Sequence, residues 1–95
     1  MAYVLVHQKV NDYAKWKPVF DEHAPVRKDQ ATSKGGYVFQ SADDPNEVIV
    51  LLEVADTDKA RAFTQSDELR EIMQKAGVTS QPHIHILELA DRPSA

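Results

Sequence analysis

Residues 37–54, YVFQSADDPNEVIVLLEV, decide the fold. β-Branched and aromatic residues fill both ends of this stretch, and the central ADDPN holds the Asp, Pro and Asn residues that favour turns. The pattern predicts a hairpin with strands at Tyr37–Ser41 and Glu47–Val54. Alternation places Val48, Val50, Leu52 and Val54 on one face of the second strand and Ile49, Leu51 and Glu53 on the other. Both faces of this strand are therefore largely apolar.

The segment before the hairpin combines a strand with a helical pattern. Tyr3–Val10 is rich in β-branched and aromatic residues, Asp12 can cap a helix, and apolar residues then recur at helical spacing. Pro18 predicts a late start or a kink in this helix, because proline past the first turn removes a hydrogen bond. Pro25 ends or bends the helix, and a short second helix is expected before the KGG of residues 34–36.

The segment after the hairpin combines a helical pattern with a final strand. Asp56 or Thr57 caps a second helical region, which breaks near Gln65, where the sequence resembles a second cap. Gly77 follows MQKA and is expected to end this region in the left-handed conformation. The last strand is His83–Leu89.

The order of elements is therefore β-α-β-β-α-β, the split βαβ arrangement. Right-handed crossovers in both halves give the strand order 4-1-3-2, with antiparallel neighbours and both helical regions on one face. We predict one α+β, ferredoxin-like domain over residues 1–90 and a flexible tail at residues 91–95.

Alternation also predicts what each face of the sheet contacts. The Val and Ile set is expected to pack against the helices, around Trp16, Phe20 and Phe63. Nothing in the chain covers the apolar set on the other face, which comprises Tyr3, Leu5, Ile49, Leu51, Leu87 and Leu89. Exposed apolar surface forgoes roughly 25 cal/mol per Å², a serious loss for a small domain. We therefore predict a homodimer in which two sheets pack face to face.

Composition excludes several classes of function. The chain has 95 residues, a formal net charge of −4 and no basic cluster, which argues against a nucleic-acid partner. It has no cysteine, which excludes disulfides, thiolate metal sites and a cysteine nucleophile. The N-terminal MAYVLVHQKV resembles neither a signal peptide nor a membrane span. We expect a cytoplasmic protein without a membrane partner.

Three histidines are predicted to converge at one end of the uncovered face. His7 is late in the first strand, and His83 and His85 are early in the antiparallel last strand. Opposed Cβ atoms on neighbouring strands are about 4.5–5.5 Å apart, and imidazole serves as acid, base or metal ligand. We expect His7 and His85 to be catalytic and His83 to contact substrate, while a purely structural role for at least one of the three stays open. No metal site is predicted, because a third ligand and a carboxylate second shell are not evident.

The remaining candidate residues lie away from these histidines. His23 is expected at the opposite end of the sheet, where Glu53 also falls, and both are candidate substrate contacts. The alternatives are a helix-end histidine near the last carbonyls and a solvated carboxylate. The residues expected to shape the cavity are Tyr3, Leu5, Val38, Ile49 and Leu51.

Nearly the whole chain resembles a known superfamily. The segments that carry the resemblance are DYAKWKPVFDEHAPVRK (residues 12–28), SADDPNEVIVLLEVAD (41–56), KARAFTQSDELREIMQKAGV (59–78) and the last strand. They resemble the dimeric α/β barrel proteins, particularly small bacterial members related to the antibiotic biosynthesis monooxygenase family. The resemblance implies two ferredoxin-like protomers packed sheet to sheet, each enclosing a pocket between its own sheet and helices or loops.

Activities implied by the resemblance are cofactor-independent oxygenation of aromatic polyketides, polyketide cyclisation, lactone isomerisation and haem degradation. Haem-degrading members carry an Asn on the first strand and a Trp in the second helix. Here His7 stands at about the Asn position and Trp16 lies in the first helix, which argues against haem degradation. The leading hypothesis is a protein that binds a small apolar or aromatic molecule and acts as a monooxygenase without any cofactor. A non-catalytic binding or regulatory module and a polyketide cyclase or isomerase are the alternatives.

Overall fold

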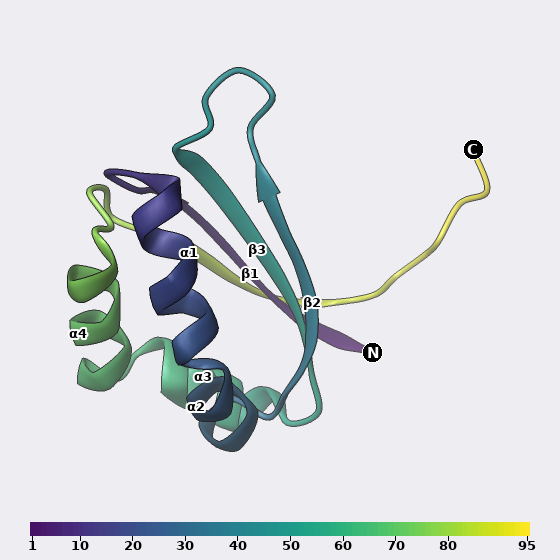
Figure 1. Ribbon diagram of the computed structural model, residues 1–95. Helices are drawn as coiled ribbons and strands as arrows, with labels where there is room; N and C mark the ends of the chain where they lie inside the picture. Colours follow the sequence, from purple (N-terminus) through teal and green to yellow (C-terminus); the bar gives the residue numbers. More distant parts are fainter.

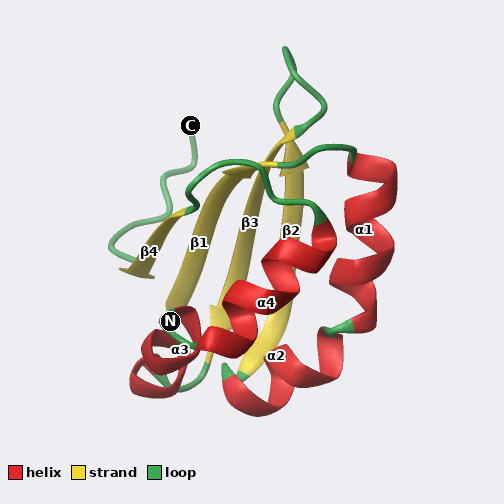
Figure 2. Ribbon diagram, turned by 90° about the vertical axis from the view of Figure 1, so that its left-hand side faces the viewer, coloured by secondary structure: helices red, strands yellow, loops and turns green.

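The computed structural model describes residues 1–95, and helices cover one face of a four-stranded sheet (Figures 1 and 2). The strand order is β2-β3-β1-β4, and all neighbours are antiparallel. The predicted ferredoxin-like βαββαβ topology and the order 4-1-3-2 are therefore confirmed. The elements are β1 (Ala2–Lys9), α1 (Tyr13–Glu22), α2 (Ala24–Gln30), β2 (Ser33–Gln40), β3 (Glu47–Val54), α3 (Thr57–Thr64), α4 (Asp67–Ala76) and β4 (His83–Glu88).

The first helical region starts at its predicted cap. The Asp12 side chain accepts a hydrogen bond from the Ala14 amide at 2.9 Å, and α1 continues through Pro18. The late start that Pro18 predicted is therefore wrong, because the cap and the buried Trp16 of α1 outweigh one missing hydrogen bond. At His23 the chain passes directly into α2, where Pro25 stands in the first turn and its missing N–H is tolerated.

Strand β2 starts earlier than predicted. The sequence indicated a strand from Tyr37, whereas pairing with β3 begins at Ser33 and passes an irregularity before Gly35. Gly35 has φ +98°, which glycine adopts without strain. Gly36 lies so close to β3 that a Cβ there would be 1.9 Å from the Leu51 carbonyl oxygen. The two glycines thus allow strand pairing instead of forming a turn.

The second helical region is broken as predicted. Asp56 caps α3, and the Ser66 hydroxyl accepts a hydrogen bond from the Leu69 amide at 3.1 Å to start α4. Gly77 ends α4 with φ +83°, in the left-handed region. None of the helices has the length and apolar character that a membrane crossing requires.

The two faces of the sheet differ as predicted. The helix side holds the core, which comprises Val4, Val6, Val10, Trp16, Val48, Val50, Val54, Ala60 and Ala76. The other face is open, and Leu87 and Leu89 remain 37% and 44% exposed. Tyr37 pairs with Leu51 and Phe39 with Ile49, so both aromatic rings also lie on the open face, where they are 63% and 50% exposed. Each of the four strands therefore contributes apolar side chains to the open sheet face.

Candidate functional site

An apolar cavity of about 80 Å³ lies between the sheet and the helices. Strands β1 and β3 form one wall with valines, and Trp16, Phe20, Phe63 and Ile72 form the other. Trp16 is only 2% exposed, and its ring stacks on that of Phe20 with 4.8 Å between centroids. The aromatic residues predicted as core thus also enclose a cavity.

Gln8 is the buried polar side chain of the cavity wall. It is 4% exposed, and its Oε1 has no hydrogen-bond partner in the protein. An unpaired buried acceptor costs roughly 1–3 kcal/mol, so Oε1 is available to a donor on a ligand. Gln8 was not identified from the sequence, although it shares the alternation of Val4 and Val6. The sequence feature that could have identified Gln8 is a polar amide that alternates with buried valines.

His23 lies on the helix side and lines the same cavity. Its Nδ1 is 2.8 Å from the Val19 carbonyl oxygen. Since a carbonyl only accepts, Nδ1 donates, and Nε2 of the neutral ring is left as a free acceptor. His23 is therefore a helix-end histidine, as the alternative interpretation held, and it is also part of the cavity wall.

Arg27 follows His23 by one helical turn and borders the cavity as well. Its Nη1 donates to the Phe20 carbonyl oxygen, and its Cζ lies 3.7 Å from the centroid of the Phe20 ring. Burial lowers the pKa of Arg27, and the Asp21 carboxylate partly offsets this effect. Arg27 still carries its charge at neutral pH, because arginine starts from so high a pKa.

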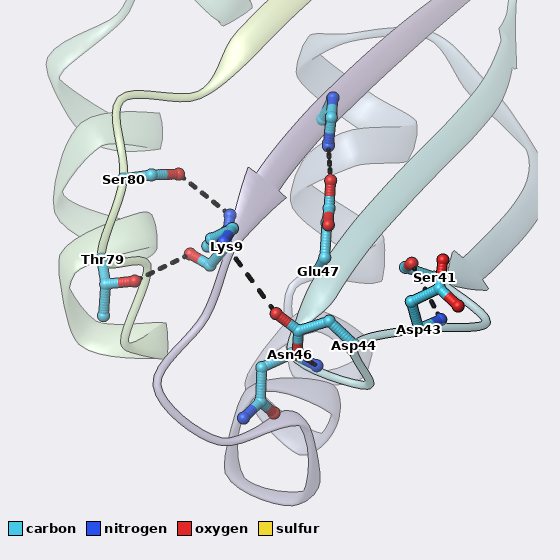
Figure 3. Close-up of polar contacts among 9 residues, drawn as sticks. Lys9, Ser41, Asp43, Asp44, Asn46, Glu47, Thr79 and Ser80 are labelled. Atoms are coloured by element: carbon cyan, nitrogen blue, oxygen red, sulfur yellow. Dashed lines mark hydrogen bonds and ion pairs between the residues drawn. The ribbon is translucent and has the colours of Figure 1, made fainter.

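The structure brings His7 and His83 together on the open face. They are paired directly across β1 and β4, with 6.3 Å between ring centroids. His85 lies opposite Leu5, one step along the same face. Glu47 was not identified from the sequence. Its Oε1 accepts a hydrogen bond from His7 Nε2 at 2.7 Å, and Figure 3 shows Glu47 with this contact dashed. No three His, Asp or Glu side chains converge closely enough to hold a metal ion.

The other predicted contacts divide between the two faces. Tyr3, Leu5, Ile49, Leu51 and Glu53 lie on the open face. Val38 lies on the other face, because it pairs with Val50 and packs against the core. The Glu53 carboxylate lies opposite Tyr3 and 3.7 Å from Lys34 Nζ, on the other side of the sheet from His23.

The fold is shared with solved structures of low sequence identity. A candidate antibiotic biosynthesis monooxygenase from Bordetella bronchiseptica superposes with a TM-score of 0.78 at 14% identity, covering 94% of this chain and 96% of that one. Another, from Caulobacter crescentus, gives 0.70 at 18% identity, with 95% and 90% covered. A variant of SnoaB, a cofactor-independent oxygenase from Streptomyces nogalater, gives 0.69 at 14% identity, with 99% and 96% covered.

No protein-family model matches the sequence, and no curated protein matches it. At these identities the similarity establishes the fold, which is the ferredoxin-like α/β fold of the antibiotic biosynthesis monooxygenase type. The resemblance drawn from the sequence is confirmed at that level.

Proposed function

We propose that the protein binds a small, largely apolar or aromatic molecule in the interior cavity and oxygenates it without a metal or flavin. The observation that carries the proposal is the buried Oε1 of Gln8, which has no partner in a mostly apolar cavity that His23, Arg27 and Thr64 also border. A few polar groups among apolar walls are typical of sites that orient a small molecule.

The cavity residues suit proton removal from a phenolic substrate. A phenolic hydroxyl donates to Gln8 Oε1, and His23 Nε2 accepts a proton from the substrate. The resulting carbanion or phenolate is electron-rich enough to reduce O₂. Oxidation of a ring CH₂ to a carbonyl supplies all four electrons: one oxygen atom goes to carbon, and the other leaves as water. For a substrate here, His23 takes the acid–base role expected of His7 and His85, which lie on the opposite face.

A second candidate site is the open face around His7, His85 and His83. It is supported by the His7–Glu47 hydrogen bond of 2.7 Å, because a carboxylate that orients an imidazole makes it an effective base. Tyr3, Leu5, Ile49 and Leu51 would provide apolar contacts there. Proton transfer without oxygen at this site is the chemistry of a cyclase or isomerase.

The proposed assembly is a homodimer through the open sheet face. Four large exposed side chains lie on this face: Tyr37, Phe39, Leu87 and Leu89. A second copy is the simplest cover for an apolar surface of this extent. The open-face histidines would then lie at the interface between two protomers.

Oxygen uptake distinguishes these functions. With an anthrone as the test substrate, the protein is expected to consume O₂ and form the quinone. His23→Ala should lower the rate by about 100-fold, the effect of losing a general base, whereas His7→Ala should change it less than about threefold. A large loss only in His7→Ala would place the chemistry on the open face. Binding without O₂ uptake or conversion would identify a non-catalytic binding module.

A further inference from the structure

A second hollow of about 420 Å³ lies outside the interior cavity, between α2 and the edge strand β2. Figures 1 and 2 show α2 beside the start of β2. The two hollows share three wall residues, which are Phe20, Arg27 and Leu52. The stacked Phe20 and Arg27 side chains therefore stand between the interior cavity and this outer groove.

The outer groove is lined by three cations in a chain whose net charge is −4. Lys34 has a carboxylate within 4 Å, that of Glu53 at 3.7 Å, whereas Lys28 forms no ion pair. Arg27 uses one of its five N–H donors in the hydrogen bond to the Phe20 carbonyl oxygen. Burial lowers the Arg27 pKa, and the Asp21 carboxylate partly offsets this effect. An anion in the groove would find donors that the protein leaves unused.

The groove is open at Gly35 of β2. A Cβ built on Gly35 would meet no atom within 4 Å, so no side chain closes the groove at this position. The neighbouring cavity alone is smaller than the roughly 150 Å³ cavity that accommodates benzene in an engineered protein. An aromatic ligand must therefore fill the cavity and extend past Phe20 into the groove.

We propose that the outer groove binds the anionic end, a carboxylate or a comparable acid, of a ligand whose apolar part occupies the interior cavity. This inference rests on the proposed function for the position of the apolar part. The anion lies against Arg27 and Lys28, where charge-assisted hydrogen bonds hold it. The site therefore selects amphipathic acids over neutral aromatic molecules of the same size.

Two fluorescent probes with the same aromatic body test the inference. The first, 8-anilinonaphthalene-1-sulfonate, carries an anion, and its analogue N-phenyl-1-naphthylamine is neutral. Lys28→Glu is expected to weaken binding of the sulfonate about tenfold, an effect reduced by added salt, and to change binding of the neutral analogue less than twofold. Lys59→Glu on α3, outside both hollows, is the matched control and should affect neither probe.

The outcomes separate the groove from the cavity. Equal sulfonate affinity in the wild-type and Lys28→Glu proteins overturns the inference, as does an equal loss for both probes. The cavity is tested separately by Ala76→Leu, which adds bulk to its wall. Unchanged binding of the neutral analogue in that variant overturns the interior site of the proposed function, whereas the comparison of the two probes decides the groove.

Discussion

The Arg27 guanidinium lies over the Phe20 ring, with Cζ 3.7 Å from the ring centroid. A hydrogen bond from Arg27 Nη1 to the Phe20 carbonyl oxygen is a second interaction between the same two residues. The pair ties α2 to the end of α1 and separates the interior cavity from the outer groove. The corner between these helices is thus both a structural joint and a wall of the candidate site.

A double-mutant cycle measures the interaction between the Phe20 and Arg27 side chains. Phe20→Leu removes the ring, and Arg27→Met removes the charge but keeps most of the side-chain length. We expect a coupling of about 0.5–2 kcal/mol in the free energy of unfolding, the range of a partly buried cation–π pair. Urea denaturation of the four proteins provides the measurement. A coupling near zero would show that the two side chains do not interact in solution.

Gln8→Leu is expected to stabilise the protein and impair its site. Replacing an unpaired buried amide by an apolar group of similar size should raise the free energy of unfolding by about 1–2 kcal/mol. Affinity for phenols should fall, because the acceptor is lost. Gln74→Leu on the exposed side of α4 is the control and should change stability by less than about 0.5 kcal/mol. Clear destabilisation by Gln8→Leu would mean that its amide is paired.

Strand β2 allows a matched pair of glycine substitutions. Gly36→Ala should cost about 3 kcal/mol or more, because the Cβ would overlap the Leu51 carbonyl. Gly35→Ala meets no neighbour and should cost only about 1 kcal/mol, from its positive φ. Thermal unfolding of both variants checks the order, and a larger loss in Gly35→Ala would contradict the observed pairing of β2 with β3.

The open face predicts the oligomeric state. The wild-type protein should sediment as a dimer at micromolar concentration, and Phe39→Glu should shift it to a monomer by burying a charge in the interface. Gln74→Glu on the helix side is the control and should remain dimeric. A wild-type protein that stays monomeric at these concentrations would refute the packing of sheet on sheet.

Features that depend on nearby residues were predictable from the sequence. The ADDPN turn, the Asp12 cap and the left-handed Gly77 each follow from local chemistry, and the element order with right-handed crossovers then gave the topology. The start of β2 was not predictable, because only the close approach to Leu51 shows why Gly36 belongs to a strand. Glycine is favoured both in turns and where two strands approach closely.

The site was predictable only in part. Strand register placed His7 beside His83, since antiparallel pairing is set by topology. The contact with Glu47 reaches diagonally between strands and depends on side-chain conformation. The face on which Gln8 lies follows from the alternation of Val4 and Val6. Its importance could not be predicted, because it depends on a cavity formed by helices packed against β1.

Contact quenching of Trp16 tests the interior binding site most directly. Trp16 is the only tryptophan, is 2% exposed and forms part of the cavity wall, so a heavy-atom quencher reports on it only from close range. Titration with 4-bromophenol is predicted to give saturable quenching that Ala76→Leu abolishes and Ala62→Leu, on exposed α3 surface, preserves. Weak quenching that rises linearly without saturation, and equally in both variants, would contradict an interior site for aromatic molecules.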